Sequence, residues 1–145
     1  MDIKNEINLV ISSKSVNEAF CRVVISAFIA PLDPTIEELS DLKTAVSEAI
    51  TNSIVHGYRD TSGKIYINAK ITIDNNVIIR IKDKGTGIAD IKEAMTPLFT
   101  TGDGDRAGLG FTVMESFCDK LRVYSKYGKG TTVVLTKRIT GHSVW

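Results

Sequence analysis

The feature that most constrains this fold is a strict alternation of apolar and polar residues over 64–73, which resumes over 77–81. A period of two is that of a strand with one buried face. The segment Asp74-Asn75-Asn76 between the two runs favours a tight turn. A hairpin that is apolar on one face must be covered there by other elements. We therefore expect helices against one face of a sheet, with these side chains facing the core: Ile65, Ile67, Ala69, Ile71, Ile73, Val77, Ile79 and Ile81.

Two helices are predicted before this hairpin, and each begins at a capping-box motif. Ser15 and Glu18 form the first motif, and Thr35 and Glu38 form the second. The second helix is long, and Gly57 can end it. The other predicted elements are a strand near 6–13, a short helix at 89–94, a helix after Gly110 and a closing hairpin over 121–125 and 131–137.

The totals are those of an ordinary globular protein, and we expect one domain over 1–145 with a flexible tail at 140–145. The net charge of +1 gives no general attraction to nucleic acid or membrane, so neither is expected as a direct partner. No apolar run of membrane-spanning length and no signal-peptide pattern occurs. Cys21 and Cys118 are isolated, which favours reduced thiols in a cytoplasmic protein over a zinc or redox site.

A polar row is predicted on the second helix. Glu48, Asn52 and His56 are spaced at i, i+4 and i+8, so they share one stripe of a regular helix. Carboxylate and amide oxygens are hard ligands that suit Mg²⁺. The alternative is a solvated helix face that ends in a histidine. Two glycine-rich stretches later in the chain favour the first interpretation.

The first glycine-rich stretch follows the predicted hairpin. Asp83 at the strand end can accept a hydrogen bond from an exocyclic amine, while Gly85 and Gly87 let a flat base approach closely. The alternative is a simple turn at the end of the strand, which Asp and Gly both favour.

The second stretch opens the last helix. Free amides at Gly108-x-Gly110 and the helix dipole favour a phosphate, and Arg106 can add a charge to a terminal phosphate. The alternatives are a helix-entry turn without ligand and an arginine in water. Residues 95–106 lack apolar periodicity, and a loop of this length is typical of a lid or binding segment. A P-loop is excluded, because no G-x-x-x-x-G-K-[ST] motif occurs.

The order of these motifs is more specific than any one of them. The helix stripe comes first, then Asp83-x-Gly85-x-Gly87, then the lid ending at Gly108-x-Gly110, then Gly130-Thr131. This order resembles the Bergerat ATP-binding fold of the GHKL superfamily, which gyrase, Hsp90, histidine kinases and MutL share. The resemblance implies an α/β two-layer sandwich with a mixed, mainly antiparallel sheet, helices on one face and an ATP lid.

Shorter segments narrow the resemblance. The segments Val46–Asn52, Pro97–Thr101 and Gly110–Glu115 look closely like those of the anti-sigma-F factors of endospore formers, which are free-standing serine kinases. Such a protein would phosphorylate a serine of an anti-anti-sigma protein with ATP and Mg²⁺. As a homodimer it would also hold a sporulation sigma factor, sigma-F, inactive. Two alternatives stay open: a general-stress anti-sigma kinase, and a non-catalytic module that senses nucleotide and sequesters its partner.

The resemblance also implies roles for individual residues. Glu48 would be the base that takes the proton from the substrate serine, and Arg106 would contact the γ-phosphate. Asn52 would coordinate the Mg²⁺ that bridges the phosphates. Arg22, on the first helix, would bind a protein partner, and His56 is given no chemical step. The remaining nucleotide contacts would be Asp83, which binds the adenine amine, with Gly85, Gly87, Gly108, Gly110 and Thr131.

Overall fold

The structure is a computed structural model that describes residues 2–58, 61–87 and 106–142, with the side chains of 106–109 outside the described part. Five strands form one sheet in the order β1-β2-β3-β5-β4. The strands are β1 (Ile3–Ser12), β2 (Lys64–Thr72), β3 (Asn76–Asp83), β4 (Lys120–Lys126) and β5 (Gly130–Arg138). The helical elements are α1 (Val16–Ile29), the 3₁₀ turn η1 (Ala30–Leu32), α2 (Ile36–Asn52), the π-helical segment η2 (Ser53–Gly57) and α4 (Arg106–Phe117).

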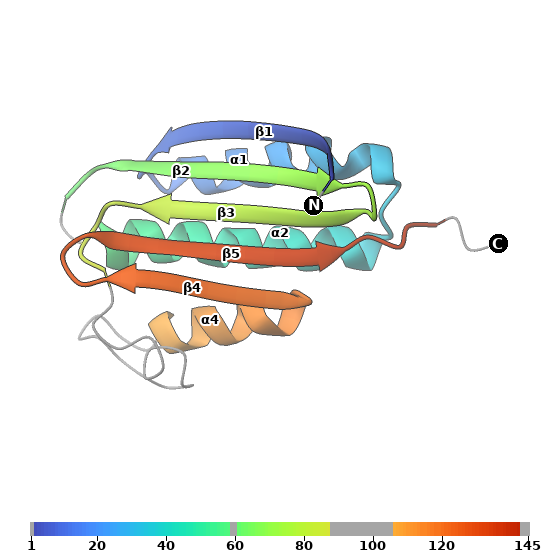
Figure 1. The fold of residues 1–145 in the computed structure, drawn as a ribbon. Coiled ribbons are helices and arrows are strands. Elements are labelled where there is room, and N and C mark those ends of the chain that lie inside the picture. Colours follow the sequence, from blue (N-terminus) through green and yellow to red (C-terminus); the bar gives the residue numbers. More distant parts are fainter. Residues whose placement is uncertain (1, 59–60, 88–105, 143–145) are drawn as a thin grey trace.

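The sheet and the helices form two layers. The helices α1, α2 and α4 all lie against one face of the sheet, and the other face carries no helix among the described elements (Figure 1). The pairings β1–β2, β2–β3, β3–β5 and β4–β5 are all antiparallel. The predicted two-layer α/β fold with a mainly antiparallel sheet is therefore confirmed.

The core lies between these layers and follows the alternation in the sequence. Of the eight positions predicted to face the core, seven are at most 3% exposed. Ile73 is the exception at 58% exposed, because β2 ends at Thr72 and Ile73 lies in the following turn. Burial of each large aliphatic side chain stabilises the fold by about 1.5–3 kcal/mol, so these alternate residues hold the helices to the sheet.

The two predicted capping boxes have different outcomes. At α2, the Glu38 N–H donates to Thr35 Oγ1 at 3.1 Å and the Thr35 N–H donates to Glu38 Oε1 at 2.9 Å, so this motif is confirmed. At α1, the Ser15 side chain makes no capping hydrogen bond, so that prediction is wrong. The Glu18 carboxylate instead accepts hydrogen bonds from Arg22 and Thr51, which joins α1 to α2.

The C-terminal segment is attached to the start of α2. Glu38 Oε2 accepts hydrogen bonds from the backbone N–H and the hydroxyl of Thr140, at 2.7 and 2.8 Å. Glu38 Oε1 accepts the Gly141 N–H at 3.1 Å, and the His142 N–H donates to the Asp33 carbonyl at 3.1 Å. These contacts hold 140–142 against the start of α2, whereas 143–145 lie outside the described residues, and the flexible tail stays a prediction.

The predicted helix at 89–94 and the lid segment up to residue 105 also lie outside the described residues. Within the parts that are described, no helix has both the length and the apolar character needed to cross a bilayer.

Candidate active site

The candidate site begins with two side chains on the last turns of α2. A Cβ atom placed on Gly110 of α4 would lie 3.3 Å from Asn52 Oδ1 and 3.4 Å from Glu48 Oε2. Glu48 and Asn52 therefore reach the same point on α4, as residues four apart on one helix face can. The carboxylate and the amide thus lie side by side at the start of a second helix.

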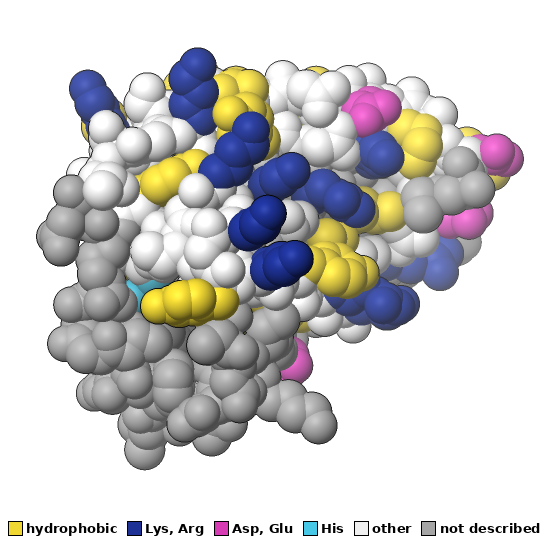
Figure 2. All heavy atoms as spheres, turned by 60° about the vertical axis from the view of Figure 1, so that its left-hand side comes forward, with side chains coloured by type: hydrophobic (Ala, Val, Ile, Leu, Met, Phe, Trp, Pro, Cys, Tyr) yellow, Lys and Arg dark blue, Asp and Glu magenta, His cyan; other side chains and the backbone are white. Residues whose placement is uncertain are grey.

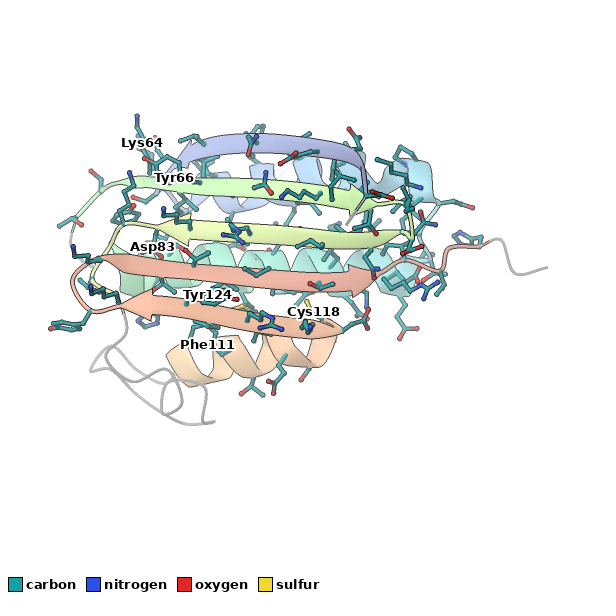
Figure 3. The ribbon with its side chains drawn as sticks, viewed as in Figure 1. Lys64, Tyr66, Asp83, Phe111, Cys118 and Tyr124 are labelled. Atoms are coloured by element: carbon teal, nitrogen blue, oxygen red, sulfur yellow. The ribbon has the colours of Figure 1, made fainter. Side chains whose placement is uncertain are left out.

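Buried side chains of α4 hold this helix next to Glu48 and Asn52 of α2. Phe111 and Met114 are 2% and 0% exposed, and they anchor the helix in the core (Figure 3). Gly110, directly before Phe111, has no side chain to fill the space above Glu48 and Asn52. Because α4 starts at Arg106, Gly110 is its fifth residue and lies past the four orphan amides of the helix start. In this structure Gly110 lets α4 approach the side chains of Glu48 and Asn52 closely.

The first turn of α4 contains two predicted phosphate contacts. Arg106 and Gly108 lie within the first four residues of the helix, where backbone N–H groups have no intrahelical acceptor. Their side-chain positions lie outside the described part, so the role of the Arg106 guanidinium stays a prediction.

Asn52 has a buried polar atom that the fold does not satisfy. Its Nδ2 is buried and has no hydrogen-bond partner among the described residues. A buried unpaired amide costs about 1–3 kcal/mol, and such groups concentrate where a ligand completes the site. An unpaired polar atom beside a carboxylate fits a polar ligand at this point.

The donor atoms at this point suit Mg²⁺. Among the described residues, no group of three or more His, Cys, Asp or Glu side chains could hold a metal ion. Glu48 and Asn52 supply oxygen donors only, which are the ligands that Mg²⁺ prefers. Because Mg²⁺ in proteins usually takes one or two such side chains and completes its shell with phosphate oxygens and water, these residues fit a nucleotide-bound Mg²⁺.

Asp83 forms the second part of the site, at the end of β3 (Figure 3). It is 3% exposed. Its Oδ1 accepts the Gly85 N–H at 2.9 Å and its Oδ2 accepts the Ser53 hydroxyl at 3.0 Å. A carboxylate has about four lone-pair positions, so besides these two donors and the Thr131 backbone the group can accept another hydrogen bond.

The environment of Asp83 opposes its ionisation. Burial raises the pKa of Asp83, and hydrogen bonds from Gly85, Ser53 and the Thr131 backbone oppose that rise. Predicted site residue Thr131 therefore lies beside Asp83, and its Oγ1 is also 2.8 Å from Ser125 Oγ. A buried carboxyl group held by fixed donors at the end of a strand is typical of a recognition site.

Glycine lets three segments meet around Asp83. A Cβ on Gly57 would lie 2.9 Å from the Asp83 carboxylate, which only glycine avoids without displacement. A Cβ on Gly85 would overlap the Gly57 carbonyl, and one on Gly130 would overlap the Asp83 carbonyl. Gly87 has φ +76°, a conformation that favours glycine. The backbone conformation and packing at positions 85 and 87 therefore favour glycine, whether or not a ligand binds there.

The end of α2 departs from the predicted helix. From Ser53 to Gly57 the chain is π-helical, and the Tyr58 N–H donates to the Ser53 carbonyl at 2.9 Å. A π turn holds more residues than an α turn, so the step from Asn52 to His56 is no longer that of a regular α-helix. Whether His56 shares the stripe of Glu48 and Asn52 therefore stays a prediction. Single π turns often occur at functional sites, and this one brings Ser53 and Gly57 to Asp83.

Ser53 and Tyr58 are the site residues that the sequence did not indicate. Ser53 bonds Asp83 directly. The Tyr58 hydroxyl accepts the Lys84 N–H at 2.8 Å and donates to the Lys64 carbonyl, so it fixes the start of the Asp83-x-Gly85 turn. A serine and a tyrosine near a helix end carry no local signal, because their partners lie in strands that follow later in the chain.

Arg22 lies on α1 beside α2. Its Nη1 donates to Glu18 Oε1 at 2.8 Å and to Ser47 Oγ at 3.0 Å. Its side chain is 37% exposed. The arginine that the sequence predicted to be exposed is therefore partly occupied by contacts with α1 and α2. Arg22 and Glu48 both line a groove of about 400 Å³ between α1 and α2, which connects the predicted partner contact to the predicted base.

Comparisons with known proteins agree on one family. Residues 13–137 match the histidine kinase-like ATPase domain. An anti-sigma F factor of Caldanaerobacter subterraneus subsp. tengcongensis is 54% identical over 140 residues, covering 96% of this chain and 97% of the relative. An anti-sigma F factor of Geobacillus is 52% identical with 95% of both chains covered, and one of Clostridium perfringens is 48% identical with 93% and 97% covered.

Solved structures show the same fold at low identity. The RsbU and RsbW domains of a Mycobacterium tuberculosis protein superpose with a TM-score of 0.69 at 21% identity, over 94% of this chain and 33% of that one. A histidine kinase domain of Erythrobacter litoralis superposes with a TM-score of 0.57 at 16% identity, over 87% and 61%. At these identities the likeness concerns the fold.

Proposed function

Because this chain belongs to the anti-sigma F factors, within the histidine kinase-like ATPase domains, we propose that it is an anti-sigma factor and an ATP-dependent protein serine/threonine kinase. In the proposed reaction it phosphorylates a serine of an anti-anti-sigma protein. In its second role it binds a sporulation sigma factor of the sigma-F type and keeps it inactive. We propose that it does both as a cytoplasmic homodimer.

One observation carries the kinase proposal. Side-chain oxygens of Glu48 and Asn52 both lie within 3.4 Å of the Cβ position of Gly110. The Nδ2 atom of the same Asn52 is buried and lacks a partner in the described residues. A base and a metal-binding amide at the start of a helix are the groups that phosphoryl transfer needs, because this reaction depends on positioning and charge neutralisation.

The nucleotide would be positioned from two directions. Asp83 would accept a hydrogen bond from the adenine amine, and Gly85 and Gly87 would leave room for the flat base. The amide groups at the start of α4, which include that of Gly108, would hold phosphate oxygens. Asn52 would direct its Oδ1 to Mg²⁺. Thr131, beside Asp83, would reach the edge of the base through its hydroxyl.

Transfer itself would depend on Glu48. Bound Mg·ATP would supply the phosphoryl group and neutralise the charge that develops on it. Glu48 would accept the proton of the substrate serine as the serine oxygen bonds to the γ-phosphorus and the bond to the leaving ADP breaks. Arg106 would stabilise the charge on the transferred group. The groove between Arg22 and Glu48 would admit the segment that carries the serine.

A labelling experiment tests this proposal. The protein is incubated with Mg²⁺, γ-labelled ATP and a candidate anti-anti-sigma protein, and label on serine is counted. Glu48→Gln should lower the rate by about 100-fold or more, because loss of a general base costs this much. Glu37→Gln, an exposed glutamate at the other end of α2, is the matched control. Absence of serine label with the unaltered protein, with sigma factor still bound, would identify a nucleotide-sensing module instead of a kinase.

A further inference from the structure

The face of the sheet that carries no helix gathers positive charge. Strand residues alternate between the two faces, and Ile79, Ile81 and Asp83 point to the helices. The register therefore places their neighbours on the open face. The register also places Lys120 and Arg138 there. Six further cationic side chains on the open face define what we call the basic face: Lys64, Lys70, Arg80, Lys82, Arg122 and Lys126. Figure 2 shows Lys and Arg side chains, in dark blue, gathered across one side of the molecule.

Acidic side chains do not balance this charge. Among the described strands, the one carboxylate on the open face is Glu6, which lies opposite Lys70 and accepts a hydrogen bond from Asn68 at 2.6 Å. No cation of the basic face forms an ion pair with a described residue, whereas Arg22 of α1 and Lys137, on the helix side of β5, do. The positive charge of this face is therefore available to a partner.

Aromatic rings stand in the same surface. The register aligns Tyr66, Lys82, Thr132 and Tyr124 in one row across four strands (Figure 3). With strands about 4.8 Å apart, the backbone positions of the two tyrosines are about 14 Å from each other. Tyr124 is 52% exposed, and Lys84 Nζ lies 5.0 Å from the centre of the Tyr66 ring. Flat rings between cations on an open sheet can stack bases while the cations contact phosphates.

We propose that the basic face binds single-stranded nucleic acid. Four of its six cations are lysines, and lysine is depleted from protein–protein interfaces but suits the phosphate backbone. The half-buried Tyr66 ring and the exposed Tyr124 ring add stacking, which an acidic protein surface would not use. The surface is separate from the candidate active site, because Asp83 points to the opposite side of β3.

The net charge of the chain does not indicate this positively charged surface. The net charge of +1 led to the expectation that nucleic acid is not a direct partner. That expectation rests on the sum over the chain, whereas binding depends on local charge. The fold places acidic side chains such as Glu18, Glu37 and Asp41 on the helix layer and the cations on the sheet.

The test is fluorescence anisotropy with labelled single-stranded DNA of about 20 nucleotides. Contact with about six phosphates predicts a slope of about −4 for log K against log salt, or about 300-fold weaker binding at about 200 mM than at about 50 mM salt. The double variant Arg80→Glu, Lys82→Glu should bind at least about tenfold more weakly, with a slope of about −3. Lys43→Glu on α2 makes the same kind of charge change away from this face and should bind as the unaltered protein does.

Two substitutions at Tyr66 test whether its ring stacks on a base. Tyr66→Leu should weaken binding at least about fivefold, and Tyr66→Phe should retain it, since the ring stacks and the hydroxyl does not. Circular dichroism melting shows that each variant is folded. The proposal is overturned if the oligonucleotide does not bind at about 50 mM salt, or if a duplex of the same length binds as tightly. Equal competition by a polyglutamate peptide would overturn it in favour of an acidic protein partner.

Discussion

The hydroxyl of Ser53 donates a 3.0 Å hydrogen bond to Oδ2 of Asp83, and both side chains are 3% exposed. The two residues are 30 positions apart, and the bond joins the π turn after α2 to the end of β3. It therefore connects the helix that carries Glu48 and Asn52 to the carboxyl group proposed to bind adenine. Four predictions follow from this arrangement and from the other contacts of the fold.

Ser53→Ala should lower the unfolding free energy by about 1–2 kcal/mol, because it leaves a buried carboxyl oxygen without its donor. It should also weaken ATP binding several-fold, since Asp83 loses one of its orienting contacts. Urea unfolding and calorimetric titration measure the two effects. Ser26→Ala, which removes a 2.7 Å bond to the Arg22 carbonyl in α1, is the control for ATP binding. Equal ATP affinity in the two variants would contradict the role given to Ser53.

The raised pKa of Asp83 predicts how stability depends on pH. An acid with a raised pKa in the folded state stabilises the fold while protonated, and this contribution is lost as the pH rises through the folded-state pKa. Relative to Asp83→Asn, which does not ionise, the unaltered protein should therefore lose stability from its unfolded-state pKa of about 4 upward. Thermal melting of both proteins across this range tests it. A constant difference between the two melting temperatures would mean that burial does not shift Asp83.

Glu38 should show the opposite pH dependence. Burial raises its pKa, but hydrogen bonds from Thr35, Thr140 and Gly141 outweigh burial and hold the pKa at about 2, below its ordinary value of 4.5. A lowered pKa stabilises the fold above pH 4.5, and this contribution is lost as the pH falls towards 2. Glu38→Gln should thus melt below the unaltered protein at pH 7, with the difference closing in acid. Glu37→Gln should melt like the unaltered protein throughout, and a similar drop in that variant would remove the special role of Glu38.

The sequence predicted the elements whose signals are local. The alternation over 64–73 and 77–81 predicted β2 and β3, because a strand with one buried face requires that period. Thr35 and Glu38 predicted the start of α2, since the motif closes within one turn. The spacing of Glu48 and Asn52 predicted a shared helix face, and both do reach Gly110.

The sequence failed where distant partners decide the structure. Ser15 and Glu18 have the spacing of a capping box, but Arg22 and Thr51 take the Glu18 carboxylate. The π turn after α2 departs from the period of 3.6 residues on which the prediction of a regular helix rested, and no local pattern indicates it. Thr140 is held by a residue 102 positions earlier, a contact that no local pattern records.

The central claim is that Asn52 binds the Mg²⁺ of a bound nucleotide, and titration of ATP with and without Mg²⁺ tests it most directly. The unaltered protein should bind ATP at least about tenfold more tightly with Mg²⁺ than without it, and Asn52→Ala should lose this difference. Asn17→Ala, which removes a bond between α1 and the Ser12 carbonyl, should keep it. If Asn52→Ala binds Mg·ATP with the full advantage of the metal, the proposed site is contradicted.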